Sequence, residues 1–101
     1  DDVVQALCRA AVTQSTSRTF NIGSGRGTSL ATLIADVESL TGRTMRVNHH
    51  PPRDSDVPTS ILDISKAASA LGWQPQMAWS TGLKDAMDWI TAHVMNEAKI
   101  T

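Results

Sequence analysis

The chain of 101 residues contains no tyrosine, a single cysteine and no long apolar run. Without tyrosine, any chemistry that depends on a phenol must be supplied from elsewhere. Cys8 cannot form an internal disulfide, which fits a reducing cytosol, so we expect a cytoplasmic protein. No stretch approaches the roughly 18 apolar residues of a membrane span, and no signal segment opens the chain. We therefore expect no membrane partner.

The charge of the chain is nearly balanced. Nine lysines and arginines face ten aspartates and glutamates, for a formal net charge of −1, and the basic residues are spread without a block. Nucleic acids and acidic membranes attract proteins through a basic surface excess, so we expect no nucleic-acid partner. With 41% apolar and 19% charged residues, the chain is typical of at most one small globular domain.

Helical patterns cover much of the chain. Capping residues and apolar residues at three- and four-residue intervals predict four helices, at about 1–12, 28–42, 64–71 and 80–94. Gly42 and Gly72 stand where left-handed residues end the second and third helices. Cys8 shares the apolar face of the first helix with Val4 and Leu7, so we expect it to be buried. Core packing is the favoured role of the three tryptophans.

Two short segments have the composition of strands. Thr19–Ile22 and Met45–His49 flank the second helix, and together they predict a right-handed parallel βαβ unit. The fold class is therefore α/β, with about two parallel strands and about four helices. Two strands make a weak sheet by themselves, so we expect a partner lobe. Without that lobe an apolar face is exposed, and we expect self-association, including a possible homo-oligomer.

Arg53 and Asp56 leave the second predicted strand three residues apart. A guanidinium offers a planar fork of donors to phosphate oxygens, and a carboxylate accepts hydrogen bonds from sugar hydroxyls. The pair suits a ligand that carries both a diphosphate and hydroxyls. The alternative is a plain surface salt bridge between i and i+3, worth about 0–1 kcal/mol. Asp54, between them, is interpreted as a solvated neighbour.

Other motifs point to structure more than to chemistry. Gly23–Gly27 precedes a helix and could hold a phosphate, but it matches neither a Walker loop nor a dinucleotide fingerprint, which favours a tight turn. His49 and His50 are adjacent on a predicted strand and would point to opposite faces, so they cannot share one metal ion. We therefore predict no metal site. No segment has the pattern of a nucleophile elbow, and no catalytic residue is assigned.

Four motifs in order resemble a known family. The motifs are Phe-Asn-Ile-Gly-Ser-Gly at 20–25, Pro-Arg-x-x-Asp-Val-Pro at 52–58, Asp-Ile-Ser-Lys-Ala at 63–67 and Leu-Gly-Trp-Gln-Pro at 71–75. Together with Asp-Asp-Val-Val at 1–4, they resemble the C-terminal part of NAD-dependent nucleotide-sugar epimerases and dehydratases. These enzymes are extended short-chain dehydrogenases, UDP-glucose 4-epimerase among them.

The resemblance implies that substrate binding and cofactor binding are carried by two separate lobes. Residues 1–101 would form the C-terminal substrate-binding lobe, and a Rossmann lobe missing from this chain would bind NAD and carry the catalytic groups. Arg53 resembles the arginine that contacts the substrate diphosphate, and Asp56 resembles the acid that contacts the ribose. The family's glycine fingerprint and Tyr-x-x-x-Lys pair have no counterpart in the sequence. The chain alone should therefore be inactive, with no cofactor-binding residue of its own.

Two alternatives remain open at this point. A nucleotide-sugar reductase or decarboxylase shares this lobe but differs in chemistry, and only residues outside the chain distinguish them. A non-enzymatic interaction module could also derive from the lobe. The nucleotide, the sugar and the distinction between epimerase and dehydratase are not encoded in these 101 residues.

Overall fold

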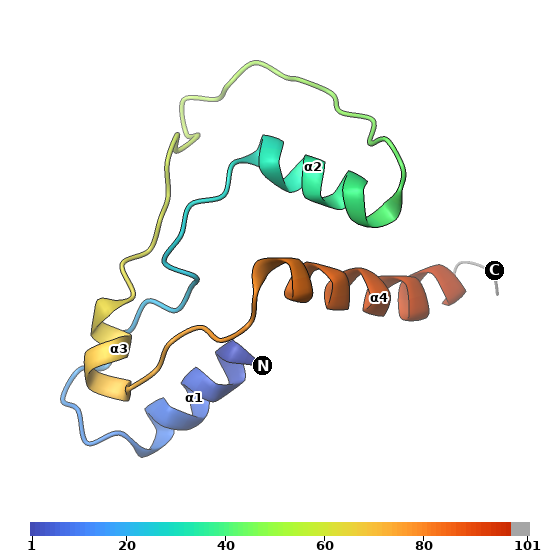
Figure 1. Cartoon of the computed structure of the whole chain (residues 1–101). Helices are drawn as coiled ribbons and strands as arrows, with labels where there is room; N and C mark the ends of the chain where they lie inside the picture. The colour runs from blue at the N-terminus through green and yellow to red at the C-terminus, as the bar shows by residue number, and fades with distance from the viewer. Residues whose placement is uncertain (98–101) are drawn as a thin grey trace. The chain divides into compact units, whose positions relative to one another are not determined.

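The structure, a computed structural model, describes residues 1–97 and contains four helices in that range. As Figure 1 shows, they follow one another along the chain and are joined by irregular segments. The helices are α1 (Asp2–Val12), α2 (Leu30–Thr41), α3 (Ser65–Leu71) and α4 (Trp79–Glu97). They fall into two compact units. The first comprises 1–29 and 47–76, and the second comprises 30–46 and the chain from 77 onward.

The first unit is built on the contact between α1 and α3. Its buried core contains the small side chain Ala67 and the large side chain Trp73, which is 2% exposed. The indole Nε1 of Trp73 donates to the carbonyl of Asp2 at 2.9 Å, so the ring's one polar atom is satisfied. The core also includes Ala6 and Leu71, with Phe20, Ile22 and Ile64 packed against it.

The C-terminus of α3 is closed by backbone and side-chain bonds. Gly72 is left-handed, with φ 60° and ψ 26°, and its N–H donates to Ala68 O at 3.1 Å. The N–H of Trp73 donates to Ala67 O at 3.3 Å, which confirms the predicted left-handed cap and the fold-back of the tryptophan. Arg9 Nη1 donates to Gly72 O at 2.6 Å. A cation thus lies at the negative end of the α3 dipole and ties it to α1.

The second unit is built on the contact between α2 and α4. Trp79 Nε1 donates to Asp36 Oδ2 at 2.7 Å and links the start of α4 to α2. Gly42 ends α2 with φ 64°, as predicted, and its N–H donates to Glu38 O at 2.9 Å. Within this unit α4 begins at Trp79, one residue earlier than the expected cap at Ser80.

The predicted βαβ unit is absent from residues 1–97, because neither Thr19–Ile22 nor Met45–His49 forms a strand. A short β-prone segment becomes a strand only when a neighbour pairs with its backbone groups. The boundary between the two units falls inside Met45–His49, between Arg46 and Val47. The described fold is therefore helical where an α/β lobe was expected.

Cys8 of α1, which was expected to be buried, is exposed together with the apolar residues around it. Val4 and Leu7 are 60% and 65% exposed. The buried residue of α1 is Ala6, which packs with the α3 core. The reason is incomplete coverage, because α3 is seven residues long and α1 is eleven. Among residues 1–97, no other helix of the first unit packs on α1.

Only one of the three tryptophans lies in a core. Trp79 and Trp89 are 51% and 58% exposed. Trp89 stacks on His93 one turn later in α4, with ring centroids 4.7 Å apart and planes 15° apart. Composition alone could not separate these two from Trp73, because an indole packs equally well on a helix surface.

Candidate functional site

The two predicted site residues, Arg53 and Asp56, lie together on one tight turn. Arg53 Nη2 is 3.0 Å from Asp56 Oδ1, and Arg53 Nε donates to the same oxygen at 3.1 Å. The backbone N–H of Arg53 donates to Asp56 Oδ2 at 2.8 Å. The N–H of Asp56 donates back to Arg53 O at 2.9 Å, which closes the turn. This is the geometry of the surface i, i+3 salt bridge that the sequence left open as the alternative, and the strand from which the pair was expected to emerge is not formed.

Both side chains of this turn are open to solvent, with the Arg53 side chain 80% exposed and the Asp56 side chain 42% exposed. An ion pair as exposed as this contributes about 0–1 kcal/mol to folding. The pair therefore adds little to the stability of the fold. The guanidinium presents an accessible, positively charged donor group, which is the chemistry that recognises phosphate oxygens.

The glycine-rich turn Gly23–Gly27 lies against the segment that leads into α3. A Cβ added at Gly27 would lie 2.7 Å from Ile61 Cδ1, and one added at Gly25 would lie 3.2 Å from Ile64 Cδ1. Gly25 also has φ +69°, a conformation that a residue with a side chain adopts at a cost. Close packing and turn geometry therefore explain these glycines, in line with the interpretation as a tight turn.

A polar hollow of about 400 Å³, missed by the sequence analysis, lies in the first unit. Asn21 Nδ2 donates to Asp63 O at 3.3 Å, and so joins the glycine turn to the start of α3. Asp63 Oδ1 accepts from the Ser65 hydroxyl at 2.6 Å and from its N–H at 2.9 Å. The spacing of Asp63 and Ser65 was the available signal, since an acid just before a helix bonds its first N–H groups. The lining residues are Thr19, Asn21, Asp63, Ser65 and Lys66.

The Ser65 hydroxyl, and after it the Ser65 N–H, lowers the pKa of Asp63 below its usual value. A carboxyl whose folded pKa is lowered stabilises the fold above its unfolded pKa, and this contribution is lost as the pH falls through the folded pKa. We expect Ser65→Ala to raise the pKa of Asp63 toward the usual value, because the larger of the two causes is removed. Titration of the Asp63 carboxyl by NMR measures this shift.

The matched control for that titration is Ser69→Ala in the same helix. The Ser69 hydroxyl donates to Lys66 O and has no bond to Asp63. Ser69→Ala should leave the Asp63 titration unchanged. An Asp63 pKa that is equal in wild type and Ser65→Ala would contradict the assignment. The difference in the free energy of unfolding between the wild type and Ser65→Ala should also shrink as the pH falls through the folded pKa of Asp63.

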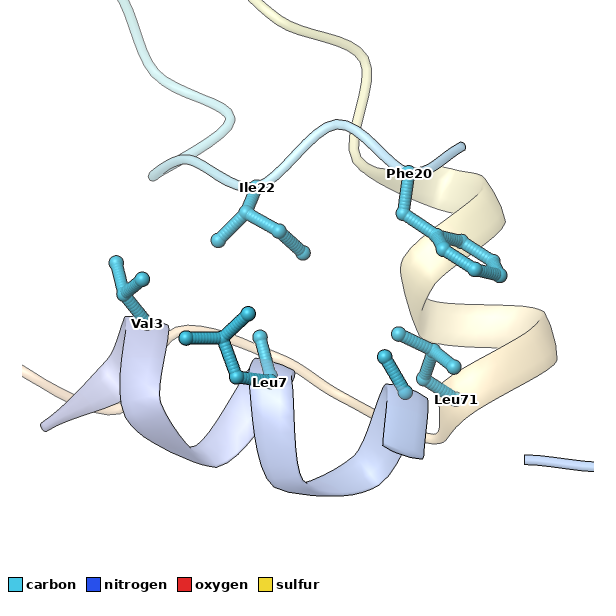
Figure 2. A pocket seen from close by; sticks show the side chains of 7 residues that line it. Val3, Leu7, Phe20, Ile22 and Leu71 are labelled. Carbon is cyan, nitrogen blue, oxygen red and sulfur yellow. The ribbon is translucent and has the colours of Figure 1, made fainter. Parts of the chain in front are cut away.

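An apolar hollow of about 150 Å³ lies between α1 and the segment that holds Phe20 and Ile22. Figure 2 shows Val3 and Leu7 of α1 on one side of it, with Leu71 of α3 closing one end. The lining is almost wholly aliphatic and aromatic and contains no ionisable side chain, so the hollow offers contact area but no chemistry.

The histidines do not form a metal site. His49 and His50 are exposed, and within residues 1–97 no three His, Cys, Asp or Glu side chains lie close enough to hold a metal ion. His93 Nδ1 lies 2.9 Å from Trp89 O in its own helix, a distance at which the Nδ1–H donates to that carbonyl. In the same range, no helix has the length and apolar content that crossing a membrane requires.

The sequence is similar to those of enzymes that act on nucleotide sugars, although no family profile matches it. It is 36% identical over 89 residues to a UDP-glucose 4-epimerase of Mycolicibacterium smegmatis, covering 88% of this chain and 28% of that protein. It is 30% identical over 82 residues to a dTDP-4-dehydro-6-deoxyglucose reductase of Escherichia coli, covering 81% of this chain and 26% of the relative.

A solved structure of a nucleotide-sugar epimerase is also similar to this chain. The crystal structure of UDP-glucose 4-epimerase from Thermotoga maritima, determined with UDP-glucose, superimposes with a TM-score of 0.83 and 37% identity. The match covers 93% of this chain and 30% of that one. The chain thus spans less than a third of the length of these relatives. It belongs to the nucleotide-sugar epimerase family that includes UDP-glucose 4-epimerase, and matches one segment of such a protein.

Proposed function

We propose that this chain is the nucleotide-sugar-binding segment of an NAD-dependent epimerase or dehydratase. In this proposal it corresponds to the C-terminal substrate-binding lobe, with Arg53 contacting the diphosphate and Asp56 facing the ribose. The main support is the exposed guanidinium and carboxylate held on one turn, in a chain similar to an epimerase solved with UDP-glucose. A rigid turn with an accessible cation is suited to a phosphate group.

The residues of this chain do not fit NAD itself. A dinucleotide site needs a glycine turn whose backbone N–H groups are open to a pyrophosphate. The open space at Gly25 and Gly27 is instead taken by Ile64 and Ile61. The chain also lacks the tyrosine that the family's proton chemistry uses. We therefore place the cofactor and the catalytic groups in another part of the full-length protein, and assign binding alone to residues 1–101.

The exposed apolar side chains of the first unit support a partner lobe. Val3 and Leu7 line the apolar hollow and are 60% and 65% exposed, and Val4 beside them is 60% exposed. A small protein rarely leaves a continuous apolar face of this kind to water. In the proposal, the Rossmann lobe of the full-length protein covers this face, and self-association takes its place when the lobe is missing.

A reductase of a nucleotide sugar is the second candidate function. It is favoured by the similarity to the dTDP-4-dehydro-6-deoxyglucose reductase, which extends over 81% of this chain. An exposed arginine that contacts a diphosphate would serve both enzymes, because both take a sugar linked to a nucleoside diphosphate. A reductase consumes a stoichiometric reductant, whereas an epimerase does not, so assay of the full-length protein separates the two.

The binding proposal is tested by titrating the 101-residue chain calorimetrically with UDP-glucose, UDP and glucose. We expect saturable binding of UDP-glucose and UDP and no binding of glucose, because the diphosphate supplies the charge that Arg53 recognises. We also expect no turnover of UDP-glucose by the chain with NAD. Equal heats for glucose and UDP-glucose, or no binding of UDP at millimolar concentration, would contradict the binding role. Turnover would contradict the placement of the catalytic groups elsewhere.

A further inference from the structure

We propose that Asp56 acts on the diphosphate through Arg53, as the residue that orients the guanidinium. This inference rests on the proposed function and adds a role to it, since Asp56 was assigned above to the ribose alone. Its basis is the way in which one carboxylate holds both the side chain and the backbone of Arg53 in the same turn.

Both oxygens of the Asp56 carboxylate bond Arg53. Asp56 Oδ1 accepts from Nε at 3.1 Å and lies 3.0 Å from Nη2. Asp56 Oδ2 accepts from the Arg53 N–H at 2.8 Å. The carboxylate thus contacts the arginine through its side chain and its backbone, and about half of its lone pairs remain for other donors.

The Arg53 guanidinium still has N–H donors for a ligand while it is bonded to Asp56. Of its five N–H groups, the one on Nε bonds Asp56 Oδ1, and Nη2 lies 3.0 Å from the same oxygen. The side chain is 80% exposed, so the guanidinium remains accessible to a ligand. A free arginine side chain would lose rotamer entropy on binding a phosphate. The bonds to Asp56 restrict the side chain before the ligand binds, so less entropy is lost in the binding step.

Removing Asp56 has two opposite effects on the binding of an anion. Loss of a negative charge beside the guanidinium strengthens the attraction for a phosphate, whereas loss of the orienting bonds weakens the binding. Asp54 is a neighbouring exposed acid outside the ion pair, and so isolates the first effect. We expect orientation to be the larger effect, so that Asp56→Ala weakens the binding of an anion whereas Asp54→Ala leaves it unchanged or strengthens it.

The test measures binding of inorganic pyrophosphate and of uridine to the wild-type chain, Asp56→Ala and Asp54→Ala by calorimetry. We expect Asp56→Ala to weaken pyrophosphate binding by about threefold or more, the cost of ordering one long side chain. Asp54→Ala should bind pyrophosphate as well as the wild type or better. In the ¹⁵N spectrum, the Arg53 Nε–H signal should lose its protection from exchange in Asp56→Ala and keep it in Asp54→Ala.

Each other outcome overturns the inference in a recognisable way. If Asp56→Ala binds pyrophosphate as tightly as Asp54→Ala does, Asp56 does not orient the arginine. If Asp56→Ala loses uridine but keeps pyrophosphate, its role is confined to the ribose. If the wild-type chain binds neither pyrophosphate nor UDP, the proposed function fails, and this inference fails with it. Circular dichroism checks folding, which the substitution of an exposed acid should leave intact.

Discussion

Trp73→Ala is expected to lower the free energy of unfolding of the first unit by about 3–5 kcal/mol. Trp73 is 2% exposed and is the largest fully buried side chain of the described residues. Its ring packs in a core that otherwise consists of two alanines and a leucine. Truncation would leave a void in this core, and would remove the hydrogen bond from the indole N–H to the Asp2 carbonyl. Urea denaturation followed by circular dichroism measures the loss.

The matched control for this experiment is Trp89→Ala. Trp89 is 58% exposed and lies in the second unit, where its ring stacks on His93. Its truncation should cost about 1 kcal/mol or less, because most of the ring already contacts water. Equal losses for Trp73→Ala and Trp89→Ala would show that the first unit is not organised around Trp73. Trp73→Phe separates the missing hydrogen bond from the missing volume.

Arg53→Ala is expected to weaken the binding of UDP by about 10- to 100-fold. Hydrogen bonds to charged groups contribute about 1.5–3 kcal/mol, which corresponds to that range of affinity. The exposed guanidinium is the cation of the proposed diphosphate site, and its removal also leaves the Asp56 carboxylate to repel the ligand. Calorimetric titration with UDP provides the measurement. Arg53→Lys should retain part of the affinity, since it keeps the charge but not the planar fork of donors.

Arg43→Ala is the control for that titration. Arg43 is also exposed and lies in the second unit, just after α2, where its backbone N–H bonds the Thr41 hydroxyl. It carries the same charge but is not paired with an acid on a turn. Its removal should change UDP affinity by no more than about twofold, through the net charge alone. A similar loss for both arginines would mean that the chain attracts anions without a site.

Local features of the fold were predicted correctly because their causes lie within a few residues. Gly42 and Gly72 are left-handed and end their helices, as their positions after apolar runs indicated. The four helices begin and end within a few residues of the predicted ranges. Arg53 and Asp56 meet because they are three residues apart on a turn that their own bonds close. No distant part of the chain is needed for any of these.

Features that depend on distant partners were predicted poorly. Thr19–Ile22 and Met45–His49 have the composition of strands, but a strand exists only where another pairs with it. Cys8 was expected to be buried on the apolar face of α1, yet it is exposed. In the polar hollow, Asn21 meets Asp63 from 42 positions away, and the local spacing of Asp63 and Ser65 does not reveal that contact.

The sequence by itself determined the helices, the glycine ends of α2 and α3 and the ion pair of Arg53 and Asp56. It also determined the resemblance to nucleotide-sugar enzymes, which comparison confirmed. Only the tertiary structure decided which tryptophan forms the core and that Arg9 secures the end of α3. It also decided that the glycine turn packs against Ile61 and Ile64. The physical reason is range: caps and turns are closed by neighbours in the chain, whereas burial depends on which distant surfaces meet.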